Sequence, residues 1–288
     1  MRHAGWSWTH PNREGIAMLN HPPYSADDLK DPPLPGAEFV QLLHRQKAER
    51  YPEPPPLYQL LYDGSLSRDD LQLWAKNHYY YLDHGLQFST AALYVKNNDE
   101  ASRTHELRKL VKIEGRDIVN DLVGWTTPAY EELWLRFCEG LGLEREEVTA
   151  WRNFSRSYFA VSTLSLCTRW WEWSWLDGIA GLLASDLLAT ETMAKAGEVL
   201  KAQYGIGDEH LEVFQRMAED SEEDLGWEEA TLAKWACTTE RQLTAARAFR
   251  YRLDIDYQYV QPVHAAITTG ELPVQVPVSL YEEAPPAP

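Results

Sequence analysis

The chain has few cysteines and no long apolar run. Its 288 residues hold three cysteines, Cys138, Cys167 and Cys237, and no C-x-x-C pair. This spacing gives no zinc signature and is typical of a reducing compartment, so we expect a cytoplasmic protein. The sequence has no stretch of 18 apolar residues and no leader pattern at its polar start, so we expect no membrane span.

Positive charge is also scarce. Only 27 Lys and Arg stand against 44 Asp and Glu, which gives a formal net charge of −17. Nucleic acid and anionic membranes bind to clustered Lys and Arg, so we expect neither as a partner. A glycine-rich phosphate loop, strand alternation and internal repeats are missing too. What is present is a chain that is 44% hydrophobic, enough for a sizeable core.

Proline marks both ends of the chain. Residues 1–36 are proline-rich without a period, and we interpret them as an extended arm. Residues 271–288 resemble them and predict a C-terminal tail. Between the two, residues 37–270 are helical in pattern almost throughout. The sequence therefore predicts an all-α class, with a compact bundle of about seven to nine helices.

Several helix boundaries can be placed from turn and cap residues. The pattern predicts one helix from Ser67 to about Asn97 and a second from Glu100 to near Gly124. It predicts another over 146–174. Near the C-terminus it predicts two more, over about 208–223 and 228–268.

Two carboxylates, Glu114 and Asp121, fall on the predicted buried face of the second of these helices. They share a spacing of three and four residues with Leu107, Leu110 and Ile118. Buried carboxylates are rare unless they are paired, protonated or bound to a cation. The two are therefore candidates for metal binding or proton transfer. The alternative is that the stripe bends toward solvent and exposes both.

Polar and ionisable groups recur on the apolar faces of four other helices. They are His78, with Trp74 and Tyr81 on the same face, Asp186, Asp224 and Arg252. Each has an ordinary alternative: a core histidine, a solvated acidic run around Asp224, or a local ion pair. Together, five helices that offer such groups to one interior are typical of a bundle with a polar central site.

Tryptophans crowd one short segment. Trp170, Trp171, Trp173 and Trp175 lie within six residues, so they cannot all face one core. Some of them are expected at a partner subunit or in a pocket. The alternative is a large aromatic core.

The chain resembles the family of pyrroloquinoline-quinone biosynthesis protein C, within the haem-oxygenase-like and thiaminase II group. The resemblance spans about residues 38–265 and rests on the order and spacing of short segments. These are Tyr58–Gly64 (YQLLYDG), Leu71–Tyr81 (LQLWAKNHYYY), Ile113–Gly115 (IEG) and Tyr251–Ile255 (YRLDI). It implies a haem-oxygenase-like bundle with a central cavity, often a homodimer.

The resemblance also implies candidate metal ligands. Di-iron members of the group carry a Glu where Glu114 stands, a His where Asp121 stands and another Glu near Asp186. Their last ligand motif, H-x-x-x-D-x-x-H, is kept here only at its central Asp, which is Asp224; Trp227 replaces the final His. Carboxylates remain acceptable ligands for iron or manganese.

Other members imply binding residues rather than metal ligands. Arg252 matches a positively charged residue of the cofactorless quinone-forming oxidase. Tyr81 matches a ring-stacking Tyr of the thiaminase group, and His78 stands where that group carries an Asp.

Three functions stay open. The first is an O2-dependent oxidoreductase that acts on a small aromatic or amino-acid-derived metabolite, with iron or manganese held by Glu114, Asp121, Asp186 and Asp224. Its catalytic residues would be Glu114, His78, Asp121 and Arg252, and its substrate-binding residues Tyr81, Trp74, Asp186 and Arg252. The second is a cofactorless oxidase that uses the same groups. The third is a non-catalytic binding protein or partner subunit.

Overall fold

A computed structural model describes residues 32–115, 128–169 and 174–277, and this part of the chain is mainly helical. The predicted all-α class is confirmed, since the β structure in these ranges is an isolated bridge between Phe154 and Gln275. The elements are α1 (Gly36–Arg50), α2 (Pro56–Tyr62), α3 (Arg68–Tyr80), the π-helix η2 (Tyr81–Gly85), α4 (Leu86–Lys96), α5 (Glu100–Glu114), α7 (Tyr130–Gly140), α8 (Arg145–Thr149), α9 (Ser155–Arg169), α10 (Trp175–Tyr204), the 3-10 turn η3 (Asp208–His210), α11 (Glu212–Trp235), α12 (Thr239–Tyr259) and α13 (Gln261–Thr269).

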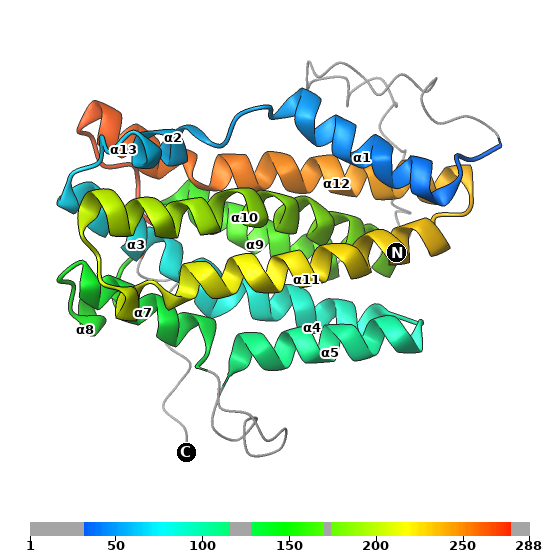
Figure 1. The fold of residues 1–288 in the computed structure, drawn as a ribbon, viewed down its shortest axis with the longest axis horizontal. Helices are drawn as coiled ribbons and strands as arrows, with labels where there is room; N and C mark the ends of the chain where they lie inside the picture. Colours follow the sequence, from blue (N-terminus) through cyan, green and yellow to red (C-terminus); the bar gives the residue numbers. More distant parts are fainter. Residues whose placement is uncertain (1–31, 116–127, 170–173, 278–288) are drawn as a thin grey trace, which may run out of the picture.

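The long helices lie side by side along the longest axis of the molecule (Figure 1). Helix α10 is central, because it packs most extensively against α11 and α12 and also contacts α4 and α9. The short helices α2, α7, α8 and α13 gather at one end of the bundle. None of the described helices is both long enough and apolar enough to cross a bilayer.

Local residues explain where several helices begin and end. Ser67 accepts a hydrogen bond from the backbone N–H of Asp70, whose carboxylate accepts one in return from Ser67, so a capping box starts α3 as predicted. Gly205 takes a left-handed conformation with φ of +68° and ends α10. The proline-rich arm over 1–36 and the tail over 271–288 lie largely outside the described residues and stay predictions.

Three predicted boundaries were wrong. The helix expected over 146–174 is interrupted between α8 and α9, where the buried Asn153 donates to the carbonyl of Asn77. No break occurs between 223 and 228, because α11 runs through that acidic stretch to Trp235. The helix expected over 228–268 is two helices, with Pro262 in the first turn of α13. Pro262 cannot donate a backbone hydrogen bond, which favours a new helix start at this point.

The predicted stripe on the Glu100 helix was also wrong. Helix α5 ends at Glu114 because Gly115 adopts φ of +47°, a left-handed conformation that stops an α-helix. Its buried face consists of Ser102, Glu106, Lys109 and Ile113, whereas Leu107 is 45% exposed. The face that enters the bundle is therefore mostly polar, and the apolar residues of the predicted stripe do not mark it. Asp121 and Ile118 lie outside the described residues.

The core divides into two hydrophobic clusters along the bundle. The first surrounds Trp74, Trp134 and Phe214, near the end with the short helices. The second surrounds Phe39 and Phe249, from α1, α12 and the first half of α10. Each of α10, α11 and α12 contributes apolar residues to both clusters. On each of these helices, the residues that lie between the two clusters build the candidate site.

Candidate functional site

Buried polar residues lie between the two hydrophobic clusters. On α10, Asp186 follows Leu183 of the second cluster and precedes Met193 of the first. A similar change from one cluster to the other occurs along α11 and α12. We call the polar residues at this level the polar layer: Glu106, Lys109, Ser185, Asp186, Ser221, Asp224, Glu228, Arg252 and Asp256.

Lys109 lies at the centre of a carboxylate cluster. Its Nζ is 2.8 Å from Oδ2 of Asp186, 2.8 Å from Oδ2 of Asp224 and 3.8 Å from Oε1 of Glu228. Burial alone would lower the pKa of Lys109, but the charges of Asp186 and Asp224 outweigh it and hold the pKa well above its ordinary value. The ammonium therefore stays charged and joins α5 to α10 and α11.

The carboxyl groups of the cluster differ in their protonation state. Burial opposes ionisation of Asp224, but Lys109 and His105 outweigh it and lower its pKa to about 2. Burial raises the pKa of Glu106 to about 8, and that of Glu228 well above its ordinary value. Both glutamates are fully buried, and the two carboxyl oxygens of Glu106 have no hydrogen-bond partner. At neutral pH, Asp224 is thus a carboxylate while Glu106 and Glu228 are carboxylic acids.

His105 supports the cluster from its outer side. Its Nε2 lies 2.7 Å from Oδ1 of Asp224. The imidazole also stacks on the indole of Trp227, with centroids 4.0 Å apart and an angle of 11° between the rings. Trp227 on α11 therefore orients a histidine from another helix.

A second ion pair occupies the α12 side of the polar layer. The Nε of Arg252 donates to both carboxylate oxygens of Asp256 at 3.0 Å. Its Nη2 donates to the hydroxyl of Ser185 at 2.8 Å and to that of Tyr81 at 3.4 Å. Burial raises the pKa of Tyr81, so its hydroxyl stays protonated. Ser185 and Asp186 are adjacent on α10 and connect the two ion pairs.

A small cavity opens onto the Lys109 cluster and onto Tyr81 and Ser185, the two hydroxyl partners of Arg252. It has a volume of about 40 Å³, and its lining includes Tyr81, Lys109, Ser185, Asp186 and Asp224. Such a volume holds a few water molecules or one O2. Pockets for drug-sized ligands are nearer 300–1,000 Å³. A metabolite could enter only if these side chains moved apart.

His78 and Trp74 lie in the aromatic core beside the polar layer. Nδ1 of His78 is 3.0 Å from the hydroxyl of Tyr259, and its ring centroid is 4.4 Å from that of Trp134. Burial lowers the pKa of His78 to about 3, so the imidazole is neutral. Trp74 is 2% exposed and packs edge to face on Trp134. Neither residue lines the small cavity, although Tyr81 contacts the His78 ring.

The structure brings together part of the predicted site. Asp186, Asp224, Arg252 and Tyr81 all belong to the polar layer or line its cavity. Glu114 is half-buried at the last position of α5, about 140° around the helix axis from Lys109, and does not line the cavity. Asp121 lies outside the described residues.

Sequence reasoning missed most residues of the site, including the four on α5 and α11 that surround Asp224. These four are His105, Glu106, Lys109 and Glu228. A signal was available, because interior carboxylates at Asp186 and Asp224 require a counter-cation. The cation was overlooked because Leu107 and Leu110 defined the wrong face of its helix.

The described carboxylates do not fit a metal ion as they are arranged. The ammonium of Lys109 is within hydrogen-bond distance of both Asp186 and Asp224, so a cation already occupies the position between them. Within the described ranges, no group of three or more His, Cys, Asp or Glu residues is arranged to hold a metal. Of the predicted iron or manganese ligands, Asp186 and Asp224 lie together at Lys109, and iron or manganese stays a prediction.

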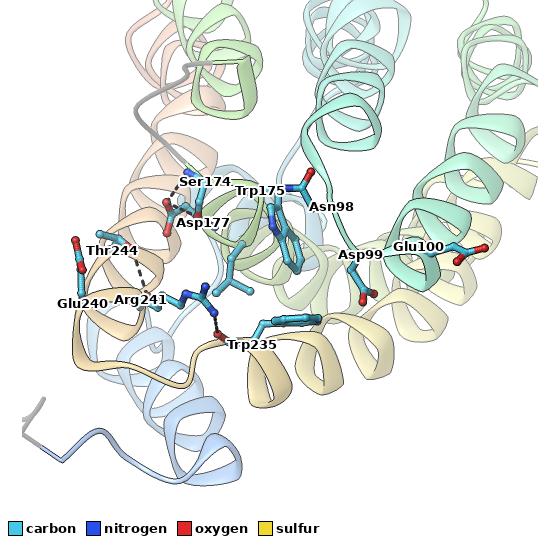
Figure 2. A pocket seen from close by; sticks show the side chains of 11 residues that line it. Asn98, Asp99, Glu100, Ser174, Trp175, Asp177, Trp235, Glu240, Arg241 and Thr244 are labelled. Atoms are coloured by element: carbon cyan, nitrogen blue, oxygen red, sulfur yellow. Dashed lines mark hydrogen bonds between the residues drawn. The ribbon is translucent and has the colours of Figure 1, made fainter.

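A larger hollow lies at the opposite end of the bundle (Figure 2). It measures about 550 Å³ and opens between the turn before α5, the start of α10, the end of α11 and the start of α12. Trp175 and Trp235 meet there edge to face, with centroids 6.0 Å apart. Of the tryptophan segment, only Trp175 is described. The hollow contains none of the predicted site residues, and the convergence of charge and shifted pKa values favours the polar layer as the site.

Comparison with known sequences gives one family. Residues 43–254 match the model of the TENA/THI-4/PQQC family. A pyrroloquinoline-quinone synthase of Granulibacter bethesdensis is 26% identical over 240 residues, 82% of this chain and 89% of that protein. One of Acidiphilium cryptum is also 26% identical, over 82% of this chain and 92% of its own length.

Solved structures agree on the fold. A domain of unknown function with a haem-oxygenase-like fold from Shewanella denitrificans aligns with a TM-score of 0.59 and 9% identity, over 81% of this chain and 93% of that one. A TenA homologue from Pseudomonas syringae pv. tomato aligns with a TM-score of 0.58 and 12% identity, over 79% and 91%. The predicted haem-oxygenase-like fold is confirmed.

Proposed function

Because the chain belongs to the TENA/THI-4/PQQC family, we propose that it is an oxidoreductase that transfers electrons from a small metabolite to O2. Relatives named pyrroloquinoline-quinone synthase support an oxidative step in biosynthesis. The observation that carries the proposal is the convergence of Lys109, Asp186 and Tyr81 on one buried cavity. The substrate class is an electron-rich aromatic or amino-acid-derived compound.

The polar layer can support such a reaction with its own groups. In a two-electron oxidation, the substrate loses two electrons and two protons, and O2 gains both and leaves as hydrogen peroxide. The carboxylate of Asp186 accepts a proton from the substrate, and the ammonium of Lys109 stabilises negative charge on the reduced oxygen. Arg252 and Tyr81 position a polar group of the substrate through the guanidinium and the hydroxyl.

This proposal favours the cofactorless alternative over iron or manganese. The reason is the position of Lys109. Its ammonium lies between Asp186 and Asp224, where a metal ion bound by the two aspartates would have to lie. No step is therefore assigned to a metal.

Oxygen uptake by the chelator-treated full-length protein tests the proposal. Reduced pyrroloquinoline quinone and dihydroxyphenylalanine serve as electron-rich probes, and rates are taken above the oxidation without protein. We expect uptake with one hydrogen peroxide formed per O2, and a loss of about 100-fold in kcat/KM for Asp186→Asn. The exposed Asp208→Asn is the matched control. Equal turnover without O2, or uptake unchanged in Asp186→Asn, would contradict the proposal.

One observation favours a second candidate, a binding or partner subunit. The main charged groups of the polar layer already pair with one another, and the cavity is only about 40 Å³. A protein of this kind would bind a probe without turning it over. Calorimetry with the same two probes separates the candidates, because heat of binding without O2 uptake supports the subunit.

The predicted homodimer and the cytoplasmic location stay proposals. Sedimentation analysis of the full chain tests the first, and cell fractionation tests the second. A monomer at micromolar concentration would contradict the dimer.

A further inference from the structure

We propose that the hollow beside Trp175 and Trp235 is a second binding site, and that it takes a small organic ammonium ion with an aromatic ring. Its volume of about 550 Å³ is in the range of pockets that hold small organic ligands. The residues of the polar layer do not line it, so the proposal is independent of the proposed oxidase.

A buried carboxylate oxygen of Asp177 has no hydrogen-bond donor. The residue lines the hollow, although it is only 4% exposed. Its Oδ2 accepts hydrogen bonds from the backbone N–H and the hydroxyl of Ser174, at 2.8 and 2.9 Å, and so caps the start of α10. Its Oδ1 is left without a partner among the described residues. Because a buried oxygen without a donor is costly, an ammonium that donates to Oδ1 from the hollow would be stabilising.

Two indoles give the hollow an aromatic wall. Trp175 and Trp235 meet edge to face beside it, with an angle of 78° between the rings (Figure 2). Such rings pack against an aromatic ligand and attract organic cations. The buried Nε1–H of Trp235 has no acceptor in the described part of the chain. A ligand that carries both an ammonium and a hydroxyl would therefore supply the partner that each of these buried atoms lacks.

The charge around the hollow favours a cation over an anion. Four acidic residues and one arginine line it: Asp99, Glu100, Asp177, Glu240 and Arg241. The guanidinium of Arg241 is engaged at the turn before α12, where its Nη1 donates to the carbonyl of Trp235 at 3.0 Å. Two lysines outside the lining offset part of the negative charge, since Lys234 is 3.4 Å from Asp99 and the charge of Asp177 acts on Lys96. The balance stays negative.

Calorimetry on the full chain with three probes of similar shape tests the proposal. Tyramine carries an ammonium, 4-ethylphenol carries no charge, and 4-hydroxyphenylacetate carries a carboxylate on the same phenol ring. We expect one molecule of tyramine to bind at least about tenfold more tightly than 4-ethylphenol, because its hydrogen bond to Asp177 is charge-assisted. We expect no binding of 4-hydroxyphenylacetate at the same concentrations.

Two matched variants locate the ammonium. Asp177→Asn keeps an oxygen for the cap of α10 but loses the negative charge, so its affinity for tyramine should fall to that for 4-ethylphenol. Asp70→Asn is the control, because Asp70 has the same place in the capping box of α3 and lies outside the hollow. This variant should bind tyramine as the native protein does.

Three results would overturn the proposal. One is an absence of tyramine binding at millimolar concentration, and another is equal affinity in the native protein and Asp177→Asn. The third is loss of binding in Asp186→Asn but not in Asp177→Asn, which would place tyramine in the polar layer. Binding that depends on Asp177, in a protein that takes up no O2, would instead contradict only the oxidase.

A second variant covers the case in which Asp177→Asn does not fold. Glu100 and Glu240 are exposed, so Glu100→Gln/Glu240→Gln removes two carboxylates of the lining without disturbing a buried group. It should weaken tyramine binding and leave 4-ethylphenol binding unchanged. Unchanged affinity for tyramine in this variant counts against the proposal equally.

Discussion

Arg252 and Asp256 form a bifurcated ion pair within one turn of α12, with Nε of the arginine 3.0 Å from both carboxylate oxygens. Both side chains are buried, at 6% and 10% exposure. The charge of Arg252 is thus already neutralised, and its Nη2 donates to the hydroxyls of Ser185 and Tyr81, which line the cavity. The pair therefore joins two consecutive turns of α12 in the interior of the bundle.

Asp256→Asn should therefore destabilise the protein. The change leaves a buried guanidinium without its carboxylate, and we expect a loss of about 3–5 kcal/mol in the free energy of unfolding. Urea denaturation measures it. The control is Asp208→Asn, which breaks the exposed pair with Lys201 and should cost less than about 1 kcal/mol. Equal effects of the two changes would mean that burial does not strengthen the Arg252 pair.

Glu106 should make stability fall as pH rises. Burial raises its pKa from 4.5 in the unfolded chain to about 8 in the folded one. Between these values the folded state holds one proton more, so the free energy of unfolding decreases by about 1.4 kcal/mol per pH unit. Glu106→Gln should remove this part of the slope. Urea denaturation from about pH 5 to pH 9 measures the difference, with the exposed Glu100→Gln as control; parallel curves would contradict it.

His78 should stay neutral across the working range of pH. Burial lowers its pKa to about 3, so the folded protein resists protonation that the unfolded chain accepts near 6.5. Its ring nitrogen signals should not move between about pH 5 and pH 8, and should titrate normally in urea. A midpoint near neutrality in the folded protein would restore His78 as a candidate catalytic residue.

Trp74 should behave as a core residue rather than a substrate ligand. It is 2% exposed and contacts Tyr58, Trp134 and Phe137. Trp74→Ala should cost about 3–5 kcal/mol in the free energy of unfolding because it leaves a cavity. Trp74→Phe should keep the KM of any turnover unchanged. A rise in KM without loss of stability would instead place the indole at the substrate.

The helical class and much of the helix order follow from the sequence, because caps such as Ser67 and stops such as Gly205 act locally. The buried face of α5 could not be predicted from the spacing of its hydrophobic residues. Its interior positions are occupied by Glu106 and Lys109, whose burial depends on partners from α10 and α11. Only the assembled bundle identifies those partners.

The same reasoning explains why the sequence identified Asp186 and Asp224 as site residues but did not identify Lys109. Each aspartate interrupts an apolar run on its own helix, so the anomaly is visible locally. Lys109 lies among charged neighbours on α5, where a lysine is ordinary. Its role appears only through the carboxylates that it contacts.

The π-helix between α3 and α4 has a consequence for comparing sequences. The backbone N–H of Leu86 donates to the carbonyl of Tyr81, five residues earlier, so this turn contains one residue more than an α-helix needs. Removing that residue would rotate α4 by about 100° relative to α3 and turn Leu93 away from Gly178, on which it packs. A relative without the extra residue must therefore be aligned with a gap between Tyr81 and Gly85, or every position of α4 is matched out of phase.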